Sequence, residues 1–301
     1  MQFKKLAIAA AVVTTVFSAQ AATEIQWWHS MTAVNNEWVN DLAKQFNESQ
    51  SDYKVVPTFK GVYDESMTAA IAAFRSGNAP DILQVFEVGT ATMMASKGAT
   101  VPVGKVMADA GVSFDPKAYI PAVAGYYTAP NGQMLSFPFN SSTTIFYYNK
   151  DAFKKAGLSD KAPTTWPEVF AAAKKLKESG HSCPMTLAWQ GWTQLESFST
   201  WHNVEFATEQ NGLSANGYKA RLKINSPLHV KHIDNLAAAA KAGEFVYKGR
   251  ASTAQASFTA GECAMIQTSS GFYGDVAKNA KFNYALAPLP YYADVKGAPQ
   301  N

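Results

Sequence analysis

The sequence has little charge of either sign. Charged residues make up 16% of its 301 residues, whereas hydrophobic residues make up 47%. This balance excludes a disordered chain and predicts a globular protein that buries a large core. The length is sufficient for two domains of ordinary size.

No excess of positive charge points to a nucleic-acid partner. The formal net charge is +3, but two of the 26 basic residues, Lys4 and Lys5, belong to the extreme N-terminus. Without them, 24 basic residues stand against 23 acidic ones. Nucleic-acid binding needs a basic face rather than an even mixture, so we expect no nucleic-acid partner.

Long apolar runs are also scarce, and the N-terminal run is the main exception. Lys4 and Lys5 precede an apolar stretch at residues 6–17, and Ala19-Gln20-Ala21 has the small-x-small pattern of a cleavage site. The stretch is too short to span a bilayer as a helix. We therefore expect residues 1–21 to be a signal peptide that is removed from a soluble, exported protein. No cysteine stands at the cleavage site, which argues against lipid attachment there.

Cysteine is rare as well, with only Cys183 and Cys263 in the chain. In an oxidising compartment the two could form a disulfide, and the alternative is two separate buried thiols. Their spacing does not decide between these. Neither cysteine has histidine or cysteine neighbours at ligand spacing, so no metal site is predicted around them.

Catalytic signatures are missing. The sequence contains no Gly-x-Ser-x-Gly, no His-Glu-x-x-His and no Gly-x-x-x-x-Gly-Lys-Ser/Thr. Carboxylates are plentiful, but none stands out as a glycosidase pair. His229 and His232 are three apart on a predicted helix and could chelate a metal, although a solvated helix face is the favoured interpretation. We predict no catalytic residue, no metal and no cofactor.

The N-terminal part alternates between strand and helix patterns. Strands are predicted at 24–28, 53–59 and 82–86, and helices at 36–47 and 63–77. Pro57 marks an edge or an end of the second strand, and the continuous apolar third strand is typical of burial on both faces. The order β-α-β-α-β predicts an α/β lobe with a parallel sheet, whose ligands bind beyond the carboxyl ends of the strands.

Three side chains follow these strand ends. Tyr63 lies after the second strand and Glu87 after the third. Glu87 either accepts hydrogen bonds from ligand hydroxyls or serves as a favourable charge at a helix N-terminus. His29, after the first strand, is interpreted as a structural histidine.

Residues 135–151 are the stretch that divides the chain. Phe137-Pro138-Phe139-Asn140 is extended, because a residue before proline is kept out of the helical region. Four hydroxyl residues follow at 141–144, and then a β-branched and aromatic run at 144–148 predicts a buried strand. A crossover between two lobes, with hydroxyls such as that of Ser142 facing the gap, would suit a small polar ligand. The alternative is an ordinary loop before a core strand.

A second α/β pattern follows. Helices are predicted from the Thr165–Glu168 capping box to Gly180 and from Ser226-Pro227 to near Gly243. A short strand at 264–266 leads into the hydroxyls of 268–270, and residues 282–290 are predicted to cross back between lobes.

Two tryptophans lie between these helices, in the segment 189–196. An indole offers a flat apolar platform for a polyol or sugar. Because Gln190, Thr193 and Gln194 make burial of both Trp189 and Trp192 less natural, we expect one of the two in a cleft.

The sequence resembles the extracellular solute-binding proteins of ABC importers, the family of maltose-binding protein, and within it the periplasmic binders of sn-glycerol-3-phosphate. The resemblance is carried by Trp28-His29-Ser30-Met31, by Trp189-Gln190-Gly191-Trp192, and by the segments 72–80, 84–97, 138–143 and 147–157. Together these segments cover nearly all of the chain after the signal peptide.

The resemblance implies an α/β, two-lobed periplasmic-binding-protein type II fold that closes on its ligand. We expect lobe 1 at 22–138, lobe 2 at 139–287 and a return crossing towards lobe 1 at 288–301. The resemblance also implies a monomer in the periplasm that captures sn-glycerol-3-phosphate, or a glycerophosphodiester such as glycerophosphocholine, for a membrane permease. It implies a set of ligand-binding residues: Tyr63, Glu87, Ser142, Trp189 and Ser269, with Trp192 as a secondary candidate.

Family members continue for more than a hundred residues beyond Asn301, so the resemblance also implies a fold that is incomplete at the C-terminus. The further residues would supply a glycine-rich loop, a tyrosine and an arginine of the site. Two other functions compete with the glycerol-phosphate carrier. One is a carrier of neutral oligosaccharides, which the tryptophans and Glu87 suit equally well. The other is an exported hydrolase of glycerophosphodiesters, for which the histidines offer no convincing catalytic pair.

Overall fold

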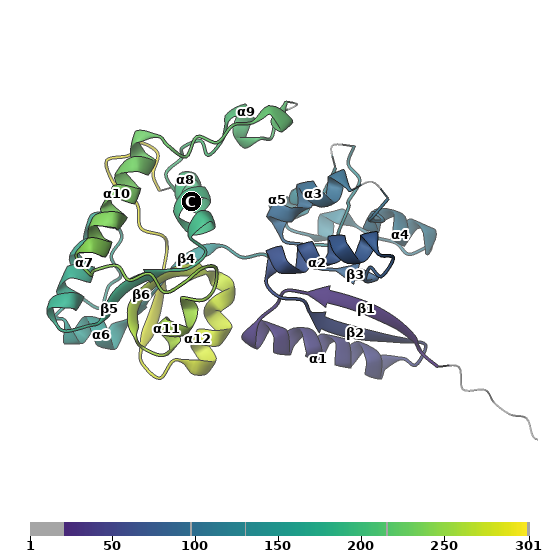
Figure 1. Cartoon of the computed structure of the whole chain (residues 1–301), viewed down its shortest axis with the longest axis horizontal. Coiled ribbons are helices and arrows are strands. Elements are labelled where there is room, and N and C mark those ends of the chain that lie inside the picture. The colour runs from purple at the N-terminus through teal and green to yellow at the C-terminus, as the bar shows by residue number, and fades with distance from the viewer. Residues whose placement is uncertain (1–20, 97, 130, 215, 300–301) are drawn as a thin grey trace, which may run out of the picture. The chain divides into compact units, whose positions relative to one another are not determined.

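A computed structural model describes residues 21–299 except 97, 130 and 215 (Figure 1). The chain divides into two compact units, residues 1–101 and residues 102–301. The boundary between the two units, after residue 101, comes before the lobe boundary that the sequence places between residues 138 and 139. The lobe boundary stays a prediction. In the described part of the chain, no helix combines the length and the apolar character needed to cross a membrane.

Unit 1 is built on a parallel sheet of three strands. These are β1 (Thr23–His29), β2 (Tyr53–Phe59) and β3 (Ile82–Leu83), in the order β2-β1-β3. Helix α1 (Ala33–Ser49) joins β1 to β2, and α2 (Tyr63–Arg75) joins β2 to β3. The 3₁₀ turn η1 (Glu87–Gly89) and α3 (Thr90–Ala95) follow. This is the predicted β-α-β-α-β order, and Pro57 lies on an edge strand as predicted.

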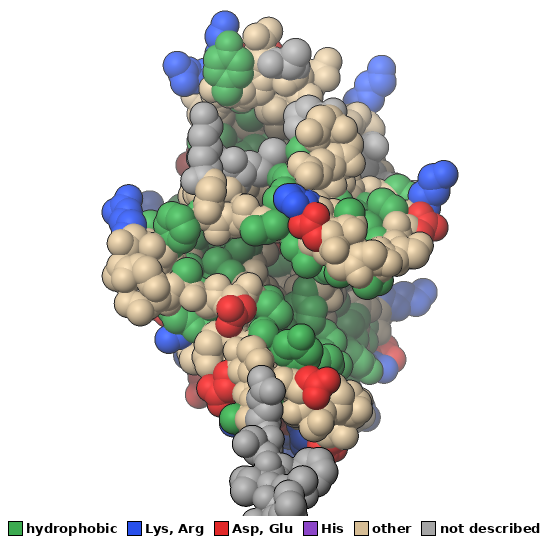
Figure 2. Space-filling view, turned by 90° about the vertical axis from the view of Figure 1, so that its right-hand side faces the viewer, with side chains coloured by type: hydrophobic (Ala, Val, Ile, Leu, Met, Phe, Trp, Pro, Cys, Tyr) green, Lys and Arg blue, Asp and Glu red, His purple; other side chains and the backbone are tan. Residues whose placement is uncertain are grey.

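Two details of unit 1 differ from the predictions. The third strand has two residues instead of five, because the chain leaves the sheet after the N–H of Gln84 bonds to the carbonyl of Trp28 at 2.9 Å. Ile82 is exposed, so this strand is not buried on both faces. On α1, Val39 is buried, whereas Trp38 and Phe46 remain 42% and 45% exposed. Figure 2 shows hydrophobic side chains at several places on one face of the molecule, with Lys and Arg side chains mostly at its margins.

Unit 2 contains a sheet of four strands in the described residues. The strands β4 (Thr144–Asn149), β5 (Cys183–Leu187), β6 (Cys263–Ser269) and β7 (Tyr284–Ala287) lie in the order β5-β6-β4-β7. β5 and β6 are parallel, and β4 runs antiparallel to both β6 and β7.

The other elements of unit 2 are helical. Before β4 lie α4 (Val103–Asp109), η2 (Pro116–Ala118) and α5 (Pro121–Tyr126). Between β4 and β6 lie α6 (Lys150–Lys155), α7 (Trp166–Glu178), the π-helix η3 (Trp192–Glu196), α8 (Ser197–Trp201), α9 (Thr208–Asn211), η4 (Gly217–Lys219), α10 (Pro227–Lys241) and α11 (Gln255–Thr259). After β6 come η5 (Ser270–Phe272) and α12 (Tyr273–Asn279).

The predicted helix starts are confirmed. Glu168 accepts from the Thr165 N–H at 2.9 Å, and its own N–H points back to the Thr165 hydroxyl at 3.4 Å, which completes the capping box of α7. Ser226 caps α10 through the N–H of His229, with Pro227 as the first helical residue.

The sheet of unit 2 separates two apolar clusters. Phe146 and Tyr148 of β4 belong to the cluster that contains α7 and α10 side chains, and Tyr147 between them belongs to the cluster with α11 and α12. This alternation is the two-residue period of a strand. The run 144–148 is therefore a core strand buried on both faces, as predicted.

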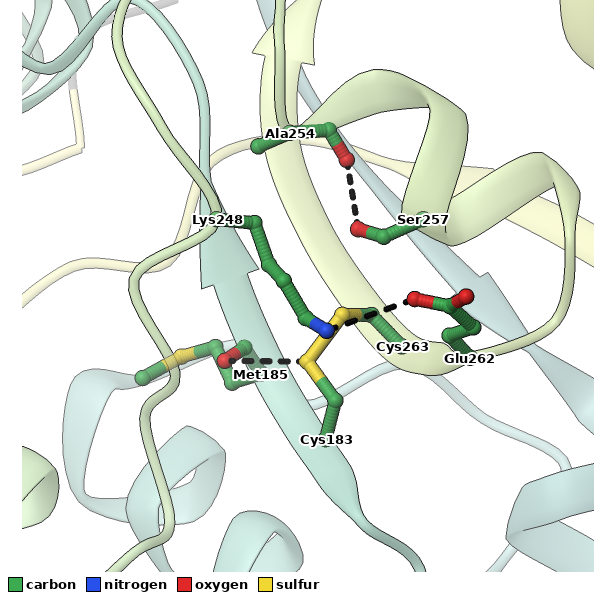
Figure 3. The surroundings of a disulfide bond; sticks show 7 residues. All are labelled: Cys183, Met185, Lys248, Ala254, Ser257, Glu262 and Cys263. Carbon is green, nitrogen blue, oxygen red and sulfur yellow. Dashed lines mark hydrogen bonds and ion pairs between the residues drawn. A yellow bond between two sulfur atoms is a disulfide. The ribbon is translucent and has the colours of Figure 1, made fainter.

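Cys183 and Cys263 form a disulfide (Figure 3). They are the first residues of β5 and β6 and lie directly opposite each other in the parallel register. Both are buried. Of the two alternatives left by the sequence, the structure therefore shows the disulfide.

Residues expected to cross back from unit 2 instead contribute to it. Tyr284–Ala287 is a strand paired with β4. Beyond it, the indole N–H of Trp201 bonds to the Leu289 carbonyl at 2.8 Å, and Tyr292 is buried in the first cluster of unit 2. The segment that includes Leu289 and Tyr292 thus packs on unit 2 in the described residues.

Candidate functional site

The carboxyl end of β5 and β6 forms one edge of the unit 2 sheet, and three predicted site residues lie there. Trp189 follows β5, and Ser269 is the last residue of β6. Because β4 is antiparallel and Thr144 pairs with Ser269, Ser142 enters the same edge just before β4. We call Ser142, Trp189 and Ser269 the unit 2 edge.

Hydrogen bonds tie the two serine-bearing loops of this edge together. The Ser270 N–H donates to the Thr143 carbonyl at 2.7 Å, and the Thr143 N–H donates to the Ser270 hydroxyl oxygen at 3.1 Å. The Tyr147 hydroxyl donates to the Ser269 carbonyl at 3.1 Å. Burial raises the pKa of this tyrosine, which keeps it a neutral donor. The buried side chain of Tyr147 therefore fixes the backbone of this edge at Ser269.

Trp189 has an unusual backbone. Its φ is +52°, in the left-handed region that non-glycine residues rarely adopt. Its N–H donates to the Ala251 carbonyl at 2.9 Å, and its carbonyl accepts from the Thr193 N–H at 2.9 Å. The ring is half-buried against the cluster that contains Phe258. Strained conformations of this kind gather at ligand sites, which supports a role for Trp189 in binding.

The sequence placed one tryptophan in a cleft on the ground that its neighbours are polar. That ground is wrong, because two of these polar neighbours belong to the core. Thr193 and Gln194 are buried, whereas Trp189 and Trp192 are both half-buried. Trp192 opens the π-helix η3, a geometry found often at functional sites. The structure thus leaves parts of both indoles accessible.

The buried Gln194 is the centre of a polar network under the edge. Its side-chain N–H groups donate to Gln267 Oε1 at 2.6 Å and to Thr193 Oγ1 at 3.0 Å. Its Oε1 accepts from His232 Nε2 at 2.9 Å. The Thr193 hydroxyl in turn donates to the Ala188 carbonyl at 3.0 Å, next to Trp189. Sequence reasoning missed this network, because its side chains come from three separate elements, η3, β6 and α10.

The prediction of a solvated face for His229 and His232 is wrong. Both are buried, as is His202, and the ring of His232 stacks on Phe198 with centroids 4.2 Å apart. Desolvation, with smaller contributions from His202 and His229, lowers the pKa of His232 to about 3. These histidines are neutral core residues. In the residues that the structure describes, no group of three or more His, Cys, Asp or Glu side chains could hold a metal ion.

Unit 1 has its own edge, at the carboxyl ends of its parallel strands. Tyr63 is the first residue of α2 after β2, and Glu87 is the first residue of η1 after β3. The Tyr63 ring stacks on Phe86 with centroids 5.1 Å apart, next to Glu87, whose side chain is exposed. Tyr63 therefore packs on the residue that precedes Glu87, and we call Tyr63 and Glu87 the unit 1 edge.

His29 lies at the end of β1 and is buried. Its Nδ1 accepts from the Met31 N–H at 3.3 Å, and desolvation lowers its pKa. This confirms the interpretation of His29 as a structural residue.

Comparison with known proteins places this arrangement in a family. The model of the bacterial extracellular solute-binding proteins matches residues 32–301. The chain belongs to this family. The match covers both units and both edges, and it confirms the family resemblance seen in the sequence.

Curated relatives within the family are similar over most of the chain. The sn-glycerol-3-phosphate-binding periplasmic protein UgpB of Rhizobium meliloti (strain 1021) is 54% identical over 278 residues, which are 92% of this chain and 64% of that protein. UgpB of Yersinia enterocolitica is 53% identical over 293 residues, or 96% of this chain and 66% of that protein. The chain thus spans slightly less than two thirds of the length of these relatives.

Solved structures confirm the type II periplasmic-binding-protein fold. UgpB from Mycobacterium tuberculosis, in complex with glycerophosphocholine, has a TM-score of 0.73 at 21% identity and aligns with 92% of this chain and 70% of its own. The GacH receptor of Streptomyces glaucescens, solved unliganded and with acarbose, has a TM-score of 0.75 at 18% identity, with 92% and 69% covered.

Proposed function

We propose that this protein is a periplasmic solute-binding protein that captures sn-glycerol-3-phosphate or a related glycerophosphodiester and delivers it to the permease of an ABC importer. The observation that carries the proposal is the 54% identity to a binding protein named for this ligand, over nearly all of the chain. The protein acts as a carrier without catalysis, as a monomer.

The two edges offer chemistry that suits a phosphorylated polyol. The hydroxyls of Ser142 and Ser269 can donate to phosphate oxygens, and the Glu87 carboxylate can accept hydrogen bonds from glycerol hydroxyls. A half-exposed indole such as that of Trp189 packs against the carbon skeleton. We propose that lobes 22–138 and 139–287 close over the ligand, so that these contacts form in a water-poor site where hydrogen bonds are stronger.

Calorimetric titration with three ligands tests the proposal. We expect saturable binding of sn-glycerol-3-phosphate or glycerophosphocholine and no binding of maltose. Binding of maltose alone would contradict the proposal and favour the oligosaccharide carrier. Release of glycerol phosphate from glycerophosphocholine during incubation would contradict the carrier role and indicate a hydrolase.

A matched pair of variants tests the site itself. Ser142→Ala removes a hydroxyl of the unit 2 edge, and Ser141→Ala removes the exposed hydroxyl beside it. We expect Ser142→Ala to weaken binding by roughly fivefold to tenfold, the equivalent of one net hydrogen bond. Ser141→Ala should leave the affinity unchanged. Equal affinities for the two variants would remove Ser142 from the site.

A further inference from the structure

The backbone of Trp189 needs support from its surroundings. Its φ of +52° lies in the left-handed region, which costs free energy in a residue that has a Cβ atom. Such a conformation persists where the surrounding structure holds it in place. The two peptide planes on either side of the Trp189 Cα set the direction in which the indole leaves the chain. Residues that fix these planes therefore fix the position of the indole at the unit 2 edge.

Thr193 forms a hydrogen bond to each of the two planes. The Ala188 carbonyl belongs to the plane before Trp189, and it accepts from the Thr193 hydroxyl at 3.0 Å. The Trp189 carbonyl belongs to the plane after it, and it accepts from the Thr193 N–H at 2.9 Å. The dihedrals φ and ψ of Trp189 are the rotations of these two rigid planes about its Cα. One residue thus restrains both dihedrals.

The Thr193 side chain is itself fixed in the core. It is completely buried, and its hydroxyl oxygen accepts from Gln194 Nε2 at 3.0 Å. The same Gln194 nitrogen donates to Gln267 Oε1, in β6, at 2.6 Å. A hydroxyl has a single proton, and with Gln194 as its donor that proton is directed to the Ala188 carbonyl. The β-branched side chain is also stiff about χ1, so the direction of this bond is set before any ligand arrives.

A neighbouring loop supports the first plane from another side. The Trp189 N–H donates to the Ala251 carbonyl at 2.9 Å, and Ala251 is itself left-handed, with a φ of +47°. Gln190 Nε2 donates to the Gly249 carbonyl at 3.1 Å, which ties the same loop to the residue after Trp189. The left-handed backbone of Trp189 is therefore held between this loop and Thr193.

We propose that Thr193 is a positioning residue for ligand binding, which holds the Trp189 indole in its binding conformation before the ligand arrives. The inference rests on the proposed function, in which Trp189 packs on the ligand. Thr193 has no exposed surface, so it acts through Trp189 and not by contact with the ligand. When a binding conformation is only partly populated, the apparent affinity falls by the populated fraction. Loss of the Thr193 hydroxyl lowers this fraction.

Stopped-flow fluorescence with sn-glycerol-3-phosphate, together with titration calorimetry, tests this assignment. Thr193→Val keeps the shape of the side chain but can neither donate to Ala188 nor accept from Gln194. We expect it to weaken binding about 5- to 20-fold, the effect of one buried hydrogen bond. The association rate should fall by the same factor, and the dissociation rate should stay within about twofold, because the bound conformation is unchanged.

Two further variants serve as controls. Thr193→Ser keeps the hydroxyl and should restore the affinity to within about threefold of the unmodified protein. Thr186, in β5, is a second completely buried threonine, but its hydroxyl has no hydrogen-bond partner among the described residues. Thr186→Val is therefore the matched control and should leave both rates unchanged.

The outcomes separate the two proposals. Unchanged affinity in Thr193→Val, with the unmodified protein binding the ligand, overturns the role of Thr193 and leaves the proposed function standing. Weakening that arises only from faster dissociation, or that is equal in Thr186→Val, also overturns it. Absence of binding by the unmodified protein overturns the proposed function and the inference together. Thermal melting verifies the folding of each variant, and Thr193→Ala, with the same expected rates, replaces Thr193→Val should the latter melt below the temperature of measurement.

Discussion

His232 Nε2 lies 2.9 Å from the side-chain oxygen of Gln194, and both residues are buried beneath the unit 2 edge. Since the Gln194 nitrogen donates to Gln267 and Thr193, its oxygen must accept, and His232 must carry its proton on Nε2. His232 Nδ1 then accepts from the Tyr292 hydroxyl at 3.3 Å. The network has one consistent orientation and joins α10, η3, β6 and the 292 segment.

Replacement of Gln194 should therefore be costly. Gln194→Leu leaves the His232 N–H and the Gln267 oxygen buried without this partner, and we expect a loss of about 2 to 4 kcal/mol in the free energy of unfolding. Urea denaturation measures it. Gln45 on α1 is exposed, so Gln45→Leu is the matched control and should cost less than about 0.5 kcal/mol. Similar losses in the two variants would contradict the network.

The buried histidines predict acid sensitivity. The folded-state pKa of His232 is lowered to about 3, mainly by desolvation, and those of His202 and His229 are also lowered. Between this value and the ordinary pKa near 6.5, the unfolded state binds more protons than the folded state, so stability falls as the pH falls. The loss for each such histidine approaches about 1.4 kcal/mol per pH unit.

Urea midpoints measured from pH 7 to pH 5 test this, because carboxylates titrate mainly below that range. His232→Gln should reduce the slope, since the variant has one fewer histidine to protonate on unfolding. If the urea midpoint of the variant falls with pH as steeply as that of the unmodified protein, His232 does not contribute to the acid sensitivity.

The disulfide makes a separate prediction. Cys183 and Cys263 are 80 residues apart, and closing a loop of that length contributes about 4 kcal/mol in the chain-entropy model. The double variant Cys183→Ser/Cys263→Ser should melt at a lower temperature and should not respond to dithiothreitol. The unmodified protein should melt lower after full reduction. A double variant as stable as the oxidised protein would contradict a stabilising role.

Trp189 can be tested for both binding and strain. Trp189→Ala and Trp189→Gly both remove the indole and should abolish detectable binding of sn-glycerol-3-phosphate. Because φ is +52° at this position, glycine avoids a cost of about 1 kcal/mol that alanine retains. The Gly variant should accordingly be at least as stable as the Ala variant. Unchanged affinity by calorimetry would remove Trp189 from the site.

Local patterns made part of this structure predictable. The capping box at Thr165 and Glu168 and the Ser226-Pro227 start depend on residues within one turn, and both were found where the sequence placed them. The run 144–148 was recognisable as a buried strand because its residue types suit a two-sided core.

Other features depend on partners far along the chain, which local patterns do not contain. Gln194 is buried because Gln267, 73 residues away, accepts its hydrogen bond, and His232 is buried because Gln194 and Tyr292 satisfy it. The pairing of Cys183 with Cys263 follows from the register of β5 and β6, which spacing does not reveal. The strand at 284–287 looked like a crossing because its pairing with β4 is equally remote.

The candidate site divides in the same way. The ends of the predicted strands placed Tyr63 and Glu87 on one edge. The antiparallel register, in which Thr144 pairs with Ser269, places Ser142 at the same edge as Ser269 in unit 2. The network around Gln194 beneath this second edge was not predicted from the sequence, because only hydrogen bonds to remote residues assemble it.

A crystal structure of the protein grown with sn-glycerol-3-phosphate tests the central claim most directly. We predict one ligand whose phosphate oxygens lie about 3 Å from the hydroxyls of Ser142 and Ser269, with Trp189 against its carbon atoms and with Tyr63 and Glu87 contacting the same molecule. A ligand bound elsewhere, or one that contacts neither edge, would contradict the account.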